Sequence, residues 1–337
     1  MNNLIIPENY KSSLDLIKTQ KAIKLIKDYF QINLSDKLNL IRVSAPLFVD
    51  KQSGFNDNLS GSEIPVSFSV LQDGKNVELE IIHSLAKWKR NALASYNIEI
   101  GEGIYTDMNA IRSCEICDNT HSYYVDQWDW EKAISPNERS EEYLKKVVKD
   151  IYDVLLDTEE MLFQKFDDYK KILPKEITFI STFELEEMYP DSSFEEREKL
   201  FAKEKGAIFI SKIGRNLKCG KPHSLRAPDY DDWDLNGDII VWNPILNDAL
   251  ELSSMGIRVD SKTLKRQLEE SKTTNRLNYE FHQNLINGKY PECIGGGIGQ
   301  SRLCMFFLQK AHIGEVQSST WPKSMIEECK IHGINLL

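Results

Sequence analysis

The chain has 337 residues, of which 41% are hydrophobic and 10% aromatic, and this composition indicates a folded protein with a large core. Its formal charge of -10 argues against nucleic acid as the main partner, because affinity for a phosphate backbone comes largely from clustered Lys and Arg. The sequence contains no run of about 18 apolar residues and does not start with a basic segment leading into an apolar one, so we expect a cytoplasmic protein without a membrane span.

The N-terminal part of the sequence predicts a long helix and then a strand. Apolar residues with helical spacing indicate that one face of the helix is buried, and they are Leu14, Ile17, Ile23, Ile26 and Phe30. In the segment 40–46, polar and apolar residues alternate and β-branched residues occur, as in a strand. Pro46 fits only at the edge or the end of a strand.

A second helix is predicted over 140–166, where apolar residues form one stripe and charged residues lie opposite. The stripe consists of Leu144, Val147, Val148, Ile151, Leu155 and Leu162. Ser193 and Glu196 form a capping box for a helix that ends near Gly206, and a strand follows over 207–213. Further strands are expected over 77–83, 121–130, 176–181 and 237–243.

The C-terminal third predicts two polar helices, over 261–271 and 275–287, and then a glycine cluster and a buried helix over 301–309. The sequence shows no internal repeat and no linker. We therefore expect a single domain over 1–337 of the α+β class, in which helices flank a mixed and largely antiparallel β-sheet.

Two glycine-containing segments resemble phosphate loops. In the segment 214–221, five residues instead of four separate the glycines and Pro222 follows the lysine, so we reject this assignment. The glycines of 295–299 lead directly into a helix with Arg302 in its first turn. Either they form a flexible turn, or they let the backbone approach a nucleotide whose terminal phosphate meets Arg302.

Cys114 and Cys117 form a close cysteine pair. A lone pair, without a second pair at zinc-finger spacing, is weak support for a metal site. We therefore expect free thiols.

Three segments, in order along the chain, resemble the three motifs of class II aminoacyl-tRNA synthetases. The N-terminal helix, the strand and Pro46 resemble motif 1, the dimer-forming element. Residues 110–115 and 124–131 resemble motif 2 of the aspartyl and asparaginyl branch, and Gly297-x-Gly299-x-x-Arg302 resembles motif 3. The resemblance implies a class II catalytic-domain fold and a homodimer.

A closer resemblance, to the ammonia-dependent asparagine synthetases, extends over nearly the whole chain. The segments that carry it are 57–61, 83–90, 101–106, 125–131, 226–233, 235–238, 251–258 and 295–303. It implies one adenylate-forming domain that uses ATP and Mg²⁺ to activate the side-chain carboxylate of aspartate, after which ammonia displaces AMP. The implied products are asparagine, AMP and pyrophosphate, and the implied partners are these small molecules.

The resemblance also implies which residues hold ATP. Arg112 should hold the α-phosphate or the attacking carboxylate and Arg302 the γ-phosphate, since a planar guanidinium binds oxyanions in a bidentate manner. Asp238 and Glu251 flank an apolar, β-like segment and are the expected Mg²⁺ ligands, because this ion usually takes one or two carboxylates plus phosphate oxygens. The other residues of the ATP site are Glu115, Gly297 and Gly299.

Aspartate needs a pocket that holds its α-ammonium and α-carboxylate groups and leaves its β-carboxylate free to attack phosphorus. The candidates for the ammonium side are Asp57, Gln127 and Asp129, the candidate for the α-carboxylate is Lys89, and Ser84 and Ser254 offer hydroxyls. A group must also accept a proton from ammonium, and Asp231, Asp57 and Asp129 remain open for this role. The expected catalytic set is Arg112, Arg302, Asp57 and Asp231.

Two other functions fit parts of this pattern. An aspartyl- or asparaginyl-tRNA synthetase would share the fold but would need an anticodon-binding module, and we expect no β-barrel-like segment before motif 1. A non-catalytic relative would keep the fold without the chemistry, and intact Arg112, Glu251 and Arg302 argue against it.

Overall fold

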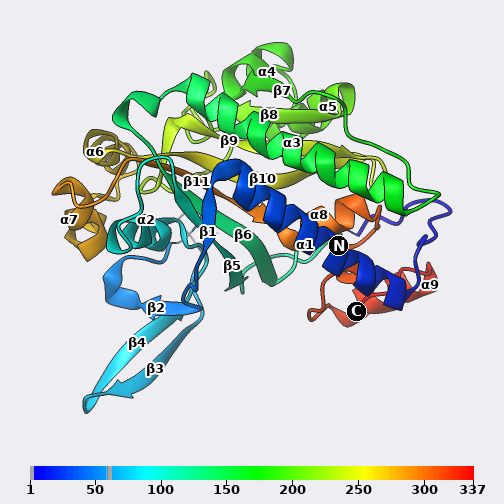
Figure 1. Ribbon diagram of the computed structural model, residues 1–337, viewed down its shortest axis with the longest axis horizontal. Helices are drawn as coiled ribbons and strands as arrows, with labels where there is room; N and C mark the ends of the chain where they lie inside the picture. Colours follow the sequence, from blue (N-terminus) through cyan, green and yellow to red (C-terminus); the bar gives the residue numbers. More distant parts are fainter. Residues whose placement is uncertain (1–3, 58, 60–62) are drawn as a thin grey trace.

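The computed structural model describes residues 4–57, 59 and 63–337, and an eight-stranded sheet lies at its centre (Figure 1). In spatial order the strands are β1 (Leu40–Arg42), β5 (Gly103–Ile111), β6 (Tyr124–Ala133), β11 (Cys293–Gly299), β10 (Asp248–Arg258), β9 (Asp231–Asn243), β8 (Ala207–Ser211) and β7 (Thr178–Ser181). The pairs at the two edges, β1 with β5 and β7 with β8, are parallel, and the other neighbouring pairs are antiparallel. The expected α+β architecture is confirmed.

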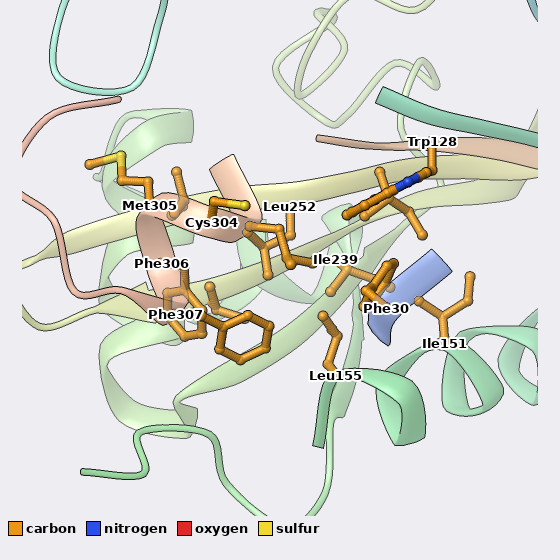
Figure 2. Packing of buried hydrophobic residues seen from close by; sticks show 14 of the residues in the cluster. Phe30, Trp128, Ile151, Leu155, Ile239, Leu252, Cys304, Met305, Phe306 and Phe307 are labelled. Carbon is orange, nitrogen blue, oxygen red and sulfur yellow. The ribbon is translucent and has the colours of Figure 1, made fainter. Parts of the chain in front are cut away.

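Two long helices, α1 (Leu16–Leu38) and α3 (Glu141–Lys165), lie side by side on one face of this sheet (Figure 1). Each begins at a residue whose side chain accepts a backbone N–H bond, Asp15 for α1 and Ser140 for α3. Phe30 of α1 contacts Trp128 of β6 with their ring centroids 4.8 Å apart, and Ile151 of α3 lies close to both (Figure 2). This packing fixes the orientation of β6, which carries several site residues.

The buried stripe of α1 differs from the predicted stripe at its start. Ile17 is 67% exposed, and Leu14 precedes the helix. Successive residues of a helix are about 100° apart, so the face that holds Ile26 and Phe30 passes through Thr19, whereas Ile17 lies on the opposite side. The buried residues of α1 are Thr19, Ala22, Ile23, Ile26, Phe30, Leu34 and Leu38.

The other face of the sheet is covered near its centre by α2 (Ala86–Ser95), which packs against β5, β6 and β11. The helix predicted over 275–287 is divided into a 3-10 helix, η3 (Thr274–Asn278), and α7 (Glu280–Ile286). The helix predicted after the glycines is α8 (Gln300–Phe307), and it is confirmed. The remaining helices are α4 (Thr182–Met188), α5 (Phe194–Lys205), α6 (Ser261–Glu270), α9 (Lys323–Ile331), η1 (Lys51–Ser53), η2 (Pro136–Glu138) and η4 (Ile313–Glu315).

A smaller antiparallel sheet projects from the body of the molecule (Figure 1). Its strands, in spatial order, are β2 (Phe48–Asp50), β4 (Lys75–Ile81) and β3 (Ser67–Gln72). The strand predicted over 77–83 is β4, and it belongs to this sheet rather than to the central one.

The glycine cluster is neither a turn nor a loop. It forms β11, a central strand that pairs with β6 and β10. In the part of the chain that the structure describes, no helix is long and apolar enough to cross a membrane.

Candidate active site

A cavity of about 550 Å³ is lined by residues of β6, β10, β11 and the loops around them. Most of the predicted site residues line it, and these are Ser84, Arg112, Glu115, Gln127, Asp129, Asp231, Glu251, Ser254, Gly297, Gly299 and Arg302. Asp57, Lys89 and Asp238 do not line this cavity. Each of them makes a hydrogen bond to a residue that does, namely Leu59, Asp129 and Arg226 respectively.

β6 directs Gln127 and Asp129 into the cavity because alternate residues of a strand point to opposite faces. Trp128 and Trp130 alternate with them and are fully buried in the core under α1 and α3. The packing of the two tryptophans therefore holds Gln127 and Asp129 on the cavity side.

The glycines of β11 leave room for side chains of the neighbouring strands. A methyl group at Gly297 would overlap the side-chain amide of Gln127, and one at Gly295 would overlap the carboxylate of Glu131. The glycine motif thus serves close packing between strands as well as an approach to a ligand.

A buried ion cluster lies at the floor of the cavity. Arg258 on β10 donates from Nε and Nη2 to the two carboxylate oxygens of Glu131, at 2.8 and 2.7 Å, and from Nη1 to Asp231. Burial alone would raise the pKa of Glu131, but the charge of Arg258 and its hydrogen bonds hold that pKa below its ordinary value. Arg258 therefore fixes the position of Asp231 at the cavity wall.

Lys89 of α2 lies beneath the cavity, and its side chain is 1% exposed. Its ammonium group donates to the Asp129 carboxylate, to the Trp130 carbonyl at 2.8 Å and to the Gly296 carbonyl at 3.2 Å. Burial raises the pKa of Asp129, and the charge of Lys89 opposes this effect. Because an ammonium group has three protons, Lys89 can bind a substrate carboxylate only by releasing one of these acceptors.

The predicted Mg²⁺ ligands lie on the β9–β10 hairpin, where Asp238 pairs with Ser254 and Glu251 pairs with Ile240. Arg226 donates to Asp238 at 2.6 Å and also to Ser254. The pKa of Asp238 is raised to about 6, because burial and the nearby charge of Glu251 outweigh the effect of Arg226. Two carboxylates are thus close enough to repel each other.

Arg112 and Arg302 enter the cavity from different elements. Arg112 follows β5, and its backbone N–H donates to the Tyr123 carbonyl at 2.8 Å, while its side-chain Nε has no partner among the described residues. Arg302, in the first turn of α8, donates to the Thr120 carbonyl at 3.3 Å and to the Glu251 carbonyl at 3.1 Å. The loop between β5 and β6 therefore touches both cations that were predicted to hold ATP.

Asp57 lies beside His83, just outside the main cavity. Its carboxylate accepts a hydrogen bond from the Leu59 N–H at 2.8 Å, and its carbonyl contacts His83 Nδ1 at 3.2 Å. Of the sequence motif 57–61, residues 58, 60 and 61 lie outside the described part of the chain. The cysteines of the nearby loop form no disulfide, and Cys114 is exposed whereas Cys117 is buried.

Four residues of this site had no role in the sequence-based prediction: Glu131, His83, Arg226 and Arg258. All four lie inside segments that carried the family resemblance, and that was the available signal. Their partners are distant in the sequence, as in the pair of Glu131 with Arg258, so that spacing along the chain gave no indication of them.

The sequence model of one protein family, described as aspartate-ammonia ligase, matches residues 17–333. The chain belongs to this family. A relative named aspartate--ammonia ligase from Clostridium tetani is 55% identical over 99% of this chain and 98% of its own length. Two more relatives of that name, from Ruminiclostridium cellulolyticum and Fusobacterium nucleatum, are 56% and 57% identical over 100% and 97% of this chain, and over 100% and 99% of their own lengths.

Solved structures support the fold of this ligase family member. An asparaginyl-tRNA synthetase from Entamoeba histolytica aligns with a TM-score of 0.63 at 14% identity, over 90% of this chain and 67% of its own. The asparaginyl-tRNA synthetase from Pyrococcus horikoshii, complexed with asparaginyl-adenylate, aligns with a TM-score of 0.64 at 14% identity, over 90% of this chain and 70% of its own. The expected class II catalytic-domain fold is confirmed.

Proposed function

We propose that this protein makes asparagine from aspartate, ammonia and ATP, through a β-aspartyl-adenylate that releases AMP and pyrophosphate. Membership of the aspartate-ammonia ligase family supports the overall reaction. The observation that carries the mechanism is a single cavity in which the arginines Arg112 and Arg302 accompany the acids Asp129 and Asp231. Cations suit the polyphosphate of ATP, and acids suit the α-ammonium group of aspartate.

The ATP end of the cavity is formed by Arg302, Arg112, Glu115 and the backbone of Gly297 and Gly299. Arg302 binds the γ-phosphate, and Arg112 binds the α-phosphate together with the β-carboxylate that attacks it. Both guanidinium groups can stabilise the charge that develops on phosphorus oxygens during the displacement of pyrophosphate.

Mg²⁺ fits the carboxylates Asp238 and Glu251. Their mutual repulsion is the kind that a divalent cation relieves, and hard oxygen ligands suit this ion. No group of three or more His, Cys, Asp or Glu side chains in the described part of the chain is arranged to hold a metal, so phosphate oxygens would complete the coordination. When bound, Mg²⁺ neutralises charge on the phosphates of ATP.

At the aspartate end, Asp57, Gln127 and Asp129 bind the α-ammonium group, and Ser84 and Ser254 offer hydroxyl hydrogen bonds. Lys89 remains the residue assigned to the α-carboxylate. Asp231, held by Arg258, lies at the wall where it can orient the incoming nitrogen. The result is an aspartate whose β-carboxylate points to the Arg112 side of the cavity.

The chain acts as one catalytic domain over 1–337, assembled as a homodimer in the cytoplasm. The class II fold and the resemblance of the first helix and strand to motif 1 support a dimer. The net charge of -10 supports small-molecule substrates rather than nucleic acid.

The decisive experiment mixes purified protein with aspartate, ammonium and MgATP, without tRNA, and identifies all products. We expect asparagine, AMP and pyrophosphate. Aspartate that carries ¹⁸O in its β-carboxylate should transfer one label to AMP, because the carboxylate oxygen remains on phosphorus when ammonia displaces AMP. Formation of ADP and phosphate, or label in phosphate alone, would rule out the adenylate.

A further inference from the structure

His83 is a rigidly held histidine that has no role in the proposed mechanism. It is 1% exposed, and it lies just before α2. Its backbone N–H donates to the side-chain oxygen of Asn56 at 2.8 Å, and its ring nitrogen Nδ1 lies 3.2 Å from the Asp57 carbonyl oxygen. Asn56 in turn donates to the Ile81 carbonyl at 3.1 Å, so both sides of this contact are anchored.

The Asp57 carbonyl determines the tautomer of the His83 ring. A carbonyl oxygen only accepts hydrogen bonds, so Nδ1 must carry the proton that it donates. In the neutral ring, Nε2 then bears the lone pair. Nε2 is buried, and it has no hydrogen-bond partner among the residues that the structure describes.

His83 lines a side chamber of about 220 Å³ next to the main cavity. Four residues line both spaces, so the two lie next to each other, and these residues are Leu59, Glu63, Arg112 and Glu115. Arg112 is the residue that the proposed mechanism places at the reacting carboxylate. Through Arg112, the side chamber therefore adjoins the part of the cavity where the proposed mechanism places the β-carboxylate of aspartate.

We propose that His83 is a catalytic residue, and that its Nε2 accepts a proton from the ammonia nitrogen during attack on the β-aspartyl-adenylate. This proposal rests on the proposed function. Ammonia enters the side chamber as the free base, and its lone pair forms the C–N bond to the β-carbonyl carbon. One N–H proton moves to Nε2, the bond from carbon to the phosphate oxygen breaks, and AMP leaves with that electron pair. Asparagine is released, and the His83 imidazolium then returns its proton to water.

The carboxylates proposed for this role are already engaged. Asp231 accepts from Arg258 and Asp129 accepts from Lys89, so each already has a cationic hydrogen-bond partner. Asp57 accepts from the Leu59 N–H. In His83, by contrast, the acceptor atom Nε2 has no donor among the described residues, and the residue lines the side chamber.

Burial, more than any nearby charge, lowers the pKa of His83 and keeps its ring neutral in neutral solution. Burial lowers the pKa of His83, the carboxylates of Asp57 and Glu63 raise it, and the guanidinium of Arg112 lowers it, with a net decrease. Glu115 and the exposed thiol of Cys114 also line the chamber. A neutral ring is the form that accepts a proton, and its rigid anchoring matches the orientation that general-base catalysis requires.

The test replaces His83 with asparagine, whose side-chain amide can still donate to the Asp57 carbonyl but has no basic nitrogen. His83→Asn should lower kcat for asparagine formation about a hundredfold, a typical contribution of a general base. Aspartate-dependent exchange of pyrophosphate into ATP, measured without ammonia, should remain unchanged. Hydroxylamine, which is already unprotonated at neutral pH and is a stronger nucleophile, should give the hydroxamate with a much smaller loss. His332→Asn, at an exposed histidine of the C-terminal region, is the matched control.

Three results would overturn the role of His83. The first is a rate of asparagine formation in His83→Asn equal to that of the wild type. The second is a loss of pyrophosphate exchange as large as the loss of asparagine formation. The third is a loss of rate that is as large with hydroxylamine as with ammonia. If circular dichroism shows that His83→Asn is unfolded, His83→Gln replaces it in the test. The same two comparisons then apply, namely exchange against asparagine formation and ammonia against hydroxylamine. Absence of exchange in the wild type, despite asparagine formation, would instead contradict the adenylate and so the proposed function.

Discussion

Glu251 offers the sharpest test of a single residue in the ATP site. Its side chain is 44% exposed, and its carboxylate lies 3.9 Å from Arg302. Glu251→Gln keeps the size and the hydrogen bonding but removes the charge, so Mg²⁺ binding should weaken. The expected loss is about 2 kcal/mol of transition-state stabilisation, roughly thirtyfold in rate. A magnesium titration at fixed ATP measures it.

The control for this variant is Glu269→Gln, which removes the same charge from an exposed position of α6. Circular dichroism should show that both variants are folded. If Glu251→Gln kept the rate and the magnesium dependence of the wild type, Glu251 would be an ordinary surface acid.

The sequence could predict site residues that their neighbours along the chain identify. It could not predict residues that depend on a partner distant in the sequence. Arg302 was predictable because glycines and an apolar helix surround it in sequence. The pair of Arg258 with Glu131 was not, because the two residues meet only when β10 and β6 are placed on either side of β11. His83 lies in a segment that carried the family resemblance, but the lack of a partner for its Nε2 among the described residues becomes apparent only from the folded structure.

Asp229 binds side chains of three helices, so a substitution at this residue tests how these helices support the cavity. It is fully buried and accepts from Lys87 of α2 at 3.3 Å, Arg276 of η3 at 2.9 Å and His282 of α7 at 2.9 Å. Burial would raise the pKa of Asp229, but these three groups hold it well below its ordinary value. Its neighbour Tyr230 lines the cavity.

Asp229→Asn should destabilise the protein by about 3 to 5 kcal/mol, because it leaves buried cations without a counter-charge. Urea unfolding measures the difference in free energy. Asp73→Asn, at the exposed turn of the β3–β4 hairpin, is the control and should change little. A stability of Asp229→Asn equal to that of the wild type would show that solvent or a rearrangement replaces the missing charge.

At the level of elements, long amphipathic helices were predictable and the glycine-rich strand was not. The apolar stripe predicted a helix over 140–166, and both ends of α3 lie within one residue of this prediction. The stripe is regular because one helix face meets the sheet along its whole length. β11 has the sequence CIGGGIG, whose low strand propensity suggested a turn or loop. Pairing with β6 and β10 on both sides outweighs that propensity, and the side chains of Gln127 and Glu131 occupy the space that larger residues would need.

At the scale of the whole molecule, we expect the free energy of unfolding to fall in mild acid because of His312. Burial lowers its pKa from 6.5 to about 4, with a smaller opposing effect of Asp118. Its Nδ1 accepts a hydrogen bond from the Gly314 N–H at 2.9 Å, so the folded state needs the neutral ring. The unfolded chain binds the proton more readily, and stability is therefore full above pH 6.5 and falls as the pH approaches 4.

Between pH 7 and pH 5, this group should cost about 2 kcal/mol of the free energy of unfolding. His312→Asn keeps an acceptor for the Gly314 N–H but does not titrate, so its stability should depend less on pH. Urea unfolding of both proteins at the two pH values isolates the contribution of His312. Equal pH dependence in the two proteins would contradict it.

The homodimer is the remaining prediction, and the structure indicates which surface could form its interface. The apolar stripe of α1 packs on the protein's own sheet, so it is not free to bind a second subunit. What remains exposed nearby is β1, the edge strand of the central sheet, with Ile41 at 55% exposure, and the outer side of α1, with Ile32 at 56%. An unpaired edge beside exposed isoleucines suits a self-complementary contact across a two-fold axis.

Light scattering of the wild type should give twice the 38.9 kDa mass of the chain. Ile41→Glu places a charge in the proposed interface, so it should shift the protein toward the monomer and lower activity at low protein concentration. Ile331→Glu, at an isoleucine of α9 that is 76% exposed, carries the same change outside that surface and should remain a dimer. A wild type that stays monomeric at every concentration and is fully active would refute the dimer, and dissociation by Ile331→Glu alone would move the interface to α9.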